Sequence, residues 1–248
     1  MVQKIMGVKK KNAPNPTNWL FEATADYAKY SNGVVANSCS LKDKFPPVYT
    51  QTYGNCTSNA VLACDAYYYH RGTKWVPSTV FTYYNQKKMS EDKPWEDDGS
   101  SIEVALDAVR KFGACNVKVW PNTEPFDKKP SKEAYADGLK GHELTKYYRV
   151  KSLSQIKKAL NSGYPVTACI AWAFKEFDNS YIMNTPTPKD IENAIYHAVV
   201  IVGYDDNTQL FEIRNSWSAE WANNGYAYIT YDVMKKIIDF WDSYAVVK

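Results

Sequence analysis

The chain has 248 residues, of which 45% are hydrophobic and 23% are charged. Disordered chains, collagens and coiled coils have other compositions, so we expect a globular fold, and at this length folding buries about 70–75% of the surface of the unfolded chain. The net charge of +3 is too small to indicate electrostatic binding of nucleic acid or of an anionic membrane.

The first residues contain lysines but no apolar run of the kind that a secretory signal requires. Met1–Asn15 carries Lys4 and the run Lys9–Lys11, which we interpret as a solvated tail. The richest apolar stretches of the chain are Val166–Phe174 and Ala198–Val202, and both are far shorter than the roughly 18 residues of a membrane helix. We therefore expect a soluble protein with no membrane partner and no nucleic-acid partner.

Helices are predicted in the first two thirds of the chain. Residues 56–71 are apolar on nearly every side, which predicts a helix buried inside the protein. Ser100–Glu103 resembles a capping box and precedes an apolar stripe that ends at Gly113. Ser152–Gln155 repeats this start signal before a stripe that ends at Gly163. These signals predict one helix after each serine pair.

Short β-rich runs follow the last predicted helix, and turn signals separate them. The runs are Pro165–Trp172, Ala198–Tyr204, Leu210–Arg214 and Tyr226–Tyr231. Helices first and strands later are typical of an α+β fold rather than an alternating, doubly wound sheet. We therefore expect a helical half and an antiparallel, barrel-like half.

The same segregation divides the chain into four parts. We expect an N-terminal extension over residues 1–44, a mainly helical lobe over 45–130 and a mainly β lobe over 131–231. Residues 232–248 are expected to pack back on the body of the protein. Residues 116–148, which are rich in proline, are interpreted as the crossing between the lobes.

Cysteine and histidine usage indicates no metal site and no disulfide framework. The five cysteines are Cys39, Cys56, Cys64, Cys115 and Cys169, without a CxxC motif, and only three histidines are present. An odd number leaves at least one cysteine unpaired. A reduced, cytosolic or cytosol-exposed protein is the simplest interpretation.

Three short segments carry the residues of a cysteine-based active site. They are Gln51–Ala60, Tyr196–Val199 and Arg214–Trp217. A thiol becomes a good nucleophile when it ionises, and a helix N-terminus together with a nearby imidazolium favours the thiolate. Cys56 begins the predicted buried helix, and a histidine at the start of a distant strand could face its sulfur across a cleft. A carboxamide such as that of Asn215 could then hold the imidazole ring through its second nitrogen.

The order and spacing of these segments resemble the papain-like cysteine peptidase superfamily. His197 follows Cys56 by 141 residues and Asn215 follows it by 159, compared with about 130–150 in papain and the cathepsins. The resemblance covers about residues 45–231. It includes the lead-in Phe45–Tyr49, the loop from Gln51 to Cys56, the His197–Val199 strand followed by Gly203 and Tyr204, and Asn215–Trp217 followed by Trp221, Gly225 and Tyr226.

The resemblance implies a role for each of four catalytic residues. Cys56 would be the nucleophile, His197 the general acid and base, Asn215 the residue that orients the imidazole, and Gln51 a hydrogen-bond donor of the oxyanion hole. The implied reaction is hydrolysis of an amide bond through a thioester acyl-enzyme, with no metal and no organic cofactor.

Further roles follow from the same resemblance. Trp217 would shield the bond between histidine and asparagine from water, and Gly99 and Ser100 would line the groove that binds the substrate backbone. A protein or peptide is the implied substrate. The oligomeric state stays open.

The sequence departs from the family pattern at several points. The segment around the nucleophile, Tyr53–Thr57, lacks a second cysteine and a tryptophan that the family usually has there, and Gln51 precedes Cys56 by five residues rather than six. Asp97–Ser100 replaces the family's Cys-Asn-Gly-Gly segment. These changes favour a divergent microbial or viral branch and a cytoplasmic or virion-associated location.

The segment that precedes the nucleophile is short for this family. Only 55 residues precede Cys56, fewer than a long inhibitory propeptide needs. We expect the first 40 residues either to cover the groove weakly or to have no effect on it.

Two other classes of function fit the same residues. One retains the triad and changes the substrate or the acceptor, as in an isopeptidase, an acyltransferase or an amidase of bacterial cell walls. The other is a non-catalytic papain-like scaffold that acts in binding or as a structural part of a virus particle.

Overall fold

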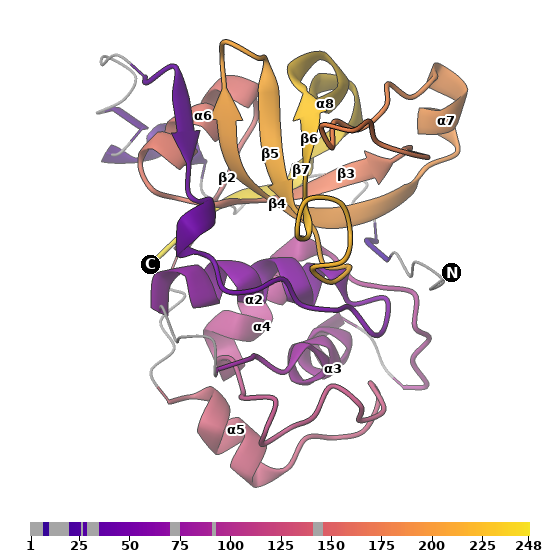
Figure 1. Ribbon diagram of the computed structural model, residues 1–248. Helices are drawn as coiled ribbons and strands as arrows, with labels where there is room; N and C mark the ends of the chain where they lie inside the picture. The colour runs from indigo at the N-terminus through magenta and orange to yellow at the C-terminus, as the bar shows by residue number, and fades with distance from the viewer. Residues whose placement is uncertain are drawn as a thin grey trace.

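The computed structural model consists of a helical lobe and a β-sheet lobe, packed one on the other (Figure 1). Both lobes meet at a long central helix, on which the sheet lies. The structure describes residues 7–9, 20–25, 27–28, 35–69, 75–90, 93–140 and 146–248.

The helical lobe is built around α2, which is buried along most of its length. The helices are α2 (Cys56–Tyr69), α3 (Thr79–Ser90), α4 (Ile102–Phe112) and α5 (Lys132–Gly138). Polar side chains of α2 that face α3 find partners there: Gln86 accepts a hydrogen bond from Ser58 and donates one to Thr57 at 2.9 Å. These bonds satisfy the buried hydroxyl groups of Thr57 and Ser58.

Serine side chains begin two of these helices, as the sequence predicts. Ser101 accepts a hydrogen bond from the N–H of Val104 at the start of α4, and Ser152 accepts one from Gln155 at the start of α6 (Leu153–Asn161). The remaining helices are α7 (Pro188–Glu192), α8 (Tyr231–Ile237) and the short 3-10 helices η1 (Phe21–Ala23) and η2 (Lys42–Lys44).

The second lobe is one antiparallel sheet. Its strands are β1 (Ser38–Ser40), β2 (Lys146–Arg149), β3 (Val166–Trp172), β4 (Ile195–Asp205), β5 (Leu210–Arg214), β6 (Tyr226–Thr230) and β7 (Ile238–Val247). They are ordered β2-β7-β3-β4-β5-β6, and β1 pairs with β4 beside this path. The predicted α+β, two-lobed architecture is therefore confirmed, and the strands described form an open sheet rather than the closed barrel that the sequence suggested.

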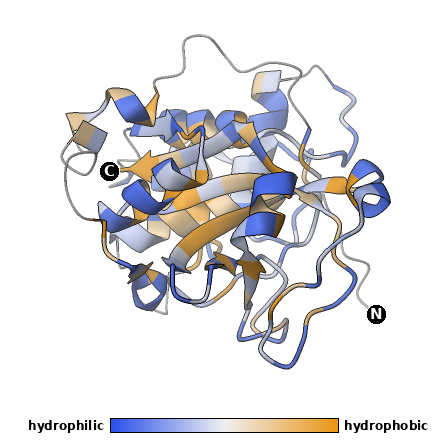
Figure 2. Cartoon of the chain, turned by 90° about the horizontal axis from the view of Figure 1, so that it is seen from above, coloured by the Kyte–Doolittle hydropathy of each residue, from blue (hydrophilic) through white to orange (hydrophobic). Residues whose placement is uncertain are grey.

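Apolar side chains gather where the sheet faces its covering helices. The central strands are the most hydrophobic part of the chain in Figure 2, and every residue of β3 is buried. One group of buried residues lies between the sheet and α6 and α8, and a second lies between the sheet, α2 and α4. The second group supports the end of α2 at which Cys56 lies.

Several predicted elements have the expected positions, and others were not anticipated. The helices after residues 56, 101 and 152 and the four predicted strands are present. The predictions did not include the helices α3, α5, α7 and α8 or the strands β1, β2 and β7. His70 and His142, the two histidines outside the predicted site, lie outside the described residues. Within the described parts, none of the helices has the length and hydropathy to cross a membrane.

Candidate active site

Cys56 is the first residue of α2 and is completely buried. The N-terminus of a helix carries a partial positive charge, which favours a thiolate. Burial nevertheless raises the pKa of the Cys56 thiol above its ordinary value, and hydrogen bonds from the backbone N–H groups of Ala198 and Gly7 only partly oppose this rise. The sulfur therefore lies against two segments that are distant in sequence, one from β4 and one from the start of the chain.

His197 and Asn215 are held together in the core of the sheet lobe. The Nε2 atom of His197 lies 2.8 Å from the Oδ1 atom of Asn215, and both residues are buried. The same oxygen accepts a hydrogen bond from the N–H of Ser216 at 2.8 Å. Because that oxygen is the acceptor, Nε2 of His197 carries the hydrogen, which leaves Nδ1 as the basic nitrogen.

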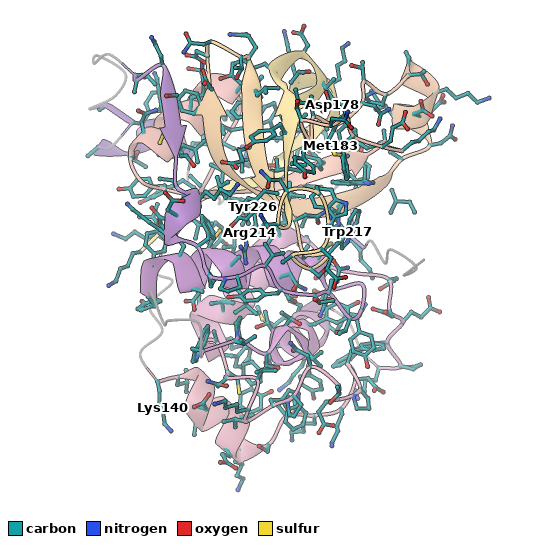
Figure 3. The ribbon with its side chains drawn as sticks, viewed as in Figure 1. Lys140, Asp178, Met183, Arg214, Trp217 and Tyr226 are labelled. Atoms are coloured by element: carbon teal, nitrogen blue, oxygen red, sulfur yellow. The ribbon has the colours of Figure 1, made fainter. Side chains whose placement is uncertain are left out.

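Two tryptophans enclose the imidazole ring. Trp217 is stacked on His197 with ring centres 4.9 Å apart and planes inclined by 28°, as expected for a side chain that shields the bond to Asn215. Trp172 meets the same imidazole with its edge at 5.1 Å and contacts Trp217 at 4.8 Å. Figure 3 shows Trp217 at the level where the sheet meets α2. The aromatic rings keep the imidazole in one orientation and exclude water from it.

Gln51 lies beside the asparagine segment. Its N–H donates to the carbonyl of Ser216 at 2.8 Å, and its Oε1 accepts a hydrogen bond from the hydroxyl of Ser216 at 2.8 Å. Its Nε2 donates to the carbonyl of Tyr53 at 2.8 Å. A carboxamide nitrogen carries two hydrogens, so this bond uses one of them.

Gly99 and Ser100 form a wall beside the end of α2. The wall is held in place by Asp97, whose Oδ1 accepts hydrogen bonds from the N–H of Gly54 at 2.8 Å and from the hydroxyl of Tyr83 at 3.0 Å. The same tyrosine oxygen accepts the N–H of Gly99 at 3.0 Å. These bonds fix the distance between the wall and the loop that carries Cys56.

A segment near the start of the chain lies between this wall and β4. The N–H of Val8 donates to the carbonyl of Tyr196 at 3.2 Å, next to His197. On the other side, the N–H of Lys9 donates to the carbonyl of Ser100 at 3.1 Å, and the N–H of Ser100 donates to the carbonyl of Gly7 at 3.3 Å. The segment therefore bridges the two lobes next to the candidate nucleophile.

The side chain of Lys9 corrects one prediction from the sequence. Its Nζ lies 3.0 Å from Oδ2 of Asp98, and Lys87, which is fully buried, holds the other carboxylate oxygen at 2.6 Å. Partial burial alone would raise the pKa of Asp98, but the hydrogen bonds from both lysines outweigh it and lower the pKa below its usual value. Lys9 is thus part of a docked segment and not of a solvated tail, while Lys10 and Lys11 lie outside the described residues.

Arg214 has a structural role that the sequence did not reveal. Its guanidinium donates to the carbonyls of Pro46 and Pro47, each at 2.7 Å, and to the hydroxyl of Tyr226 at 2.9 Å. Arg214 and Tyr226 lie close together between the sheet and α2 in Figure 3. Arg214 therefore connects the lead-in Phe45–Tyr49 to the end of β5, immediately before Asn215.

Within the described part of the chain no cluster of three or more His, Cys, Asp and Glu residues has the arrangement of a metal site. All five cysteines belong to the described residues, and none of them forms a disulfide. The predicted site residues Cys56, His197, Asn215 and Gln51 supply a thiol, an imidazole and two carboxamide groups.

Comparison with known proteins identifies the family of the chain. A model of the papain family of cysteine proteases matches residues 50–239. An uncharacterized peptidase C1-like protein of Acanthamoeba polyphaga mimivirus is 31% identical over 210 residues, which are 77% of this chain and 67% of the viral protein.

Solved structures agree in fold over most of the chain. Xylellain, a cysteine protease from Xylella fastidiosa, has a TM-score of 0.79 and 25% sequence identity, with 98% of this chain and 97% of xylellain covered. The bromelain protease from Ananas comosus, solved with the inhibitor E64, shares the fold at a TM-score of 0.62 and 20% identity, with 86% of this chain and 99% of bromelain covered. The chain belongs to the papain family of cysteine proteases.

Proposed function

We propose that this cysteine peptidase hydrolyses peptide bonds with Cys56 as nucleophile, His197 as general acid and base, and Asn215 as the residue that orients the imidazole. The observation that carries the proposal is the bond between Nε2 of His197 and Oδ1 of Asn215, made while the N–H of the next residue, Ala198, lies against the sulfur of Cys56. A base held by a third group beside a nucleophile is the arrangement that activates a thiol.

The first half of the reaction forms an acyl-enzyme. Nδ1 of His197 takes the proton of the thiol, and the Cys56 thiolate attacks the carbonyl carbon of the substrate. The carbonyl oxygen becomes an oxyanion, which the N–H of Cys56 and Nε2 of Gln51 stabilise as donors. When the carbon–nitrogen bond breaks, the imidazolium gives its proton to the leaving amine, and a thioester remains on Cys56.

The second half releases the acid. Nδ1 of His197 takes a proton from a water molecule, and the hydroxide attacks the thioester carbonyl. The carbon–sulfur bond then breaks, and the thiolate and imidazolium are restored. Trp217 and Trp172 keep the imidazole in place through both halves, so the same nitrogen serves as acid and as base.

The substrate is a protein or a peptide, whose backbone binds along Gly99 and Ser100. Their wall is tied to the loop of the nucleophile through Asp97, so backbone bonds to Ser100 would set the scissile carbonyl at a fixed distance from Cys56. A cytoplasmic or virion-associated location fits this proposal, and the five cysteines, none of which forms a disulfide, support the cytoplasm in particular.

Turnover of a fluorogenic peptide tests this function. Hydrolysis should disappear in Cys56→Ala and should persist in Cys39→Ala, a control that removes another free thiol of the chain. Peptide hydrolysis that survives in Cys56→Ala would contradict the proposal. Product analysis on an isopeptide and on a peptide with an added amine acceptor would reveal an isopeptidase or an acyltransferase that uses the same triad.

A further inference from the structure

We propose that one buried water molecule connects the carboxamide of Asn215 to Asn59 on α2 and to the hydroxyl of Tyr49, and that Asn59 is thereby a positioning residue of the reaction. The inference rests on the proposed function, because it adds the groups that hold Asn215 in the orientation that this function requires.

A small cavity lies between α2 and the sheet, next to Asn215. Its lining includes three alanines and three polar residues: Ala60, Ala63, Ala198, Tyr49, Asn59 and Asn215. The cavity offers about 10 Å³ to the centre of a water molecule, which is enough room for one water.

Three polar atoms belong to side chains that line this cavity and are themselves unsatisfied. Nδ2 of Asn215, Oδ1 of Asn59 and the hydroxyl oxygen of Tyr49 are buried, and none has a hydrogen-bond partner among the residues that the structure describes. Asn59 is 2% exposed and Asn215 is 3% exposed. Buried polar groups of this kind are costly to leave unpaired, and they are the usual partners of internal water.

The other atoms of the two carboxamides are occupied, which fixes how each carboxamide is turned. Oδ1 of Asn215 accepts the N–H of Ser216 and faces Nε2 of His197. Nδ2 of Asn59 donates to the carbonyl of Asn55 at 2.9 Å and to Oδ1 of Asn55 at 3.1 Å. A backbone N–H can only donate and a carbonyl can only accept. The atoms left over are therefore a donor on Asn215 and an acceptor on Asn59.

A water molecule matches this set of atoms. It accepts a hydrogen bond from Nδ2 of Asn215 and donates one to Oδ1 of Asn59, and the hydroxyl of Tyr49 is its third partner. About three hydrogen bonds are typical of a buried water. Burial raises the pKa of Tyr49, so its hydroxyl stays protonated and can either donate to the water or accept from it.

The water connects the two lobes at the catalytic residues. Asn215 belongs to the sheet lobe and holds His197, whereas Asn59 bonds to Asn55, the residue immediately before Cys56. The carboxamide of Asn215 is then held at its nitrogen as well as at its oxygen. Without the water it could turn about its side-chain bonds, and Nε2 of His197 would lose its acceptor for part of the time.

A crystal structure that resolves ordered water tests the first half of the proposal. We expect one water within about 2.7–3.2 Å of both Nδ2 of Asn215 and Oδ1 of Asn59. A cavity without water in well-ordered surroundings would overturn the inference, as would a direct hydrogen bond between the two carboxamides.

Kinetics in two backgrounds test the positioning role. Asn59→Leu removes the acceptor at similar size, and we expect it to lower kcat by about 2- to 10-fold, which corresponds to the net contribution of one hydrogen bond, with little change in KM. In Asn215→Ala the same substitution should have no further effect on kcat, because Asn59 acts only through Asn215. A purely structural role would lower activity by the same factor in both backgrounds, and this result would overturn the inference.

Two further variants separate this role from loss of stability. Tyr49→Phe removes only one oxygen and should lower kcat in the same way. Asn85→Leu is the matched control, since Asn85 is a buried asparagine that donates to Phe81 and accepts from Tyr135; its kcat should equal that of the wild type. Unchanged kcat in both Asn59→Leu and Tyr49→Phe would contradict the inference. Failure of the proposed function is a different result, namely hydrolysis that persists in Cys56→Ala.

Discussion

Gly7 and Gly99 pack backbone against backbone. Gly99 has a φ of +87°, and a Cβ atom there would lie 2.0 Å from the carbonyl oxygen of Gly7. A Cβ on Gly7 would lie 2.9 Å from the Cα atom of Gly99 and 3.0 Å from the carbonyl oxygen of Gly54. Only glycine fits at both positions, so the contact between the N-terminal segment and the substrate wall depends on two missing side chains.

The close contact makes Gly7 a sensitive position for control of activity. In Gly7→Val the new side chain should expel the segment and open the groove. Three backbone hydrogen bonds would be lost at about 0.5–1.5 kcal/mol each, so we expect peptide hydrolysis to increase by about tenfold or more. Steady-state kinetics on the full-length variant measure the change. An unchanged kcat/KM would mean that the segment does not limit access to Cys56.

The pKa of Cys56 leads to a prediction about pH. Burial raises this pKa while the segment is docked, so the docked state favours the neutral thiol. The neutral Cys56 thiol stabilises the docked state fully at a pH below the pKa that Cys56 has when the segment is undocked. This stabilisation is lost as the pH rises through the higher pKa of the docked state. Alkylation of Cys56 by iodoacetamide should therefore need alkaline pH in the wild type and proceed at lower pH in Gly7→Val. Superimposable pH profiles for the two proteins would contradict this expectation.

Asn215 should act on the rate of reaction rather than on binding. Without Oδ1 of Asn215, Nε2 of His197 loses its partner at 2.8 Å, and the imidazole is no longer held in the tautomer with a basic Nδ1. We expect Asn215→Ala to lower kcat by about 10- to 100-fold, part of the 10²–10⁴ that general acid–base catalysis provides. KM should change little. A lowered affinity with normal kcat would show that Asn215 contributes to binding instead.

Arg214 should contribute mainly to stability. Lysine cannot donate to two carbonyl oxygens with the fixed geometry of a guanidinium. Arg214→Lys should therefore leave a carbonyl of the proline lead-in without its donor, at a cost of about 1–3 kcal/mol. At this chain size that corresponds to a fall in Tm of about 2–4 °C for each kcal/mol. Thermal unfolding of Arg214→Lys beside Arg110→Lys, which changes an exposed arginine, tests this; equal Tm values would refute the role.

Local patterns in the sequence predicted much of the fold, and the missing parts have physical reasons. Ser101 and Ser152 begin helices because a serine can satisfy an N–H three residues ahead. The helix α3 was missed because residues 79–84 are β-branched and aromatic, which favours a strand, and because it is buried and has no polar face. Strand β7 was missed because it contains a charged residue, Asp242, that is buried. The carboxylate of Asp242 accepts the N–H of Ile102 at 2.7 Å, and this partner is too far away in the sequence for a local pattern to reveal it.

The candidate site was accessible from the sequence only in part. Cys56, His197 and Asn215 were identified because their order and spacing resemble a known family, and their catalytic roles remain proposals. The contacts of Gly7–Lys9 could not be predicted, because these three residues form no sequence motif from which their binding partners could be inferred. Their position depends on backbone hydrogen bonds and on the space left by two glycines.

Mapping of a covalent adduct tests the central claim most directly. Gly7→Val is treated with a limiting amount of a thiol-directed epoxide near neutral pH, and the modified cysteine is identified by mass spectrometry. We predict that the label lies on Cys56 and that it is strongly reduced when His197→Ala is added. Labelling that is spread over the other four cysteines, or that does not depend on His197, would contradict the assignment of Cys56 as the nucleophile.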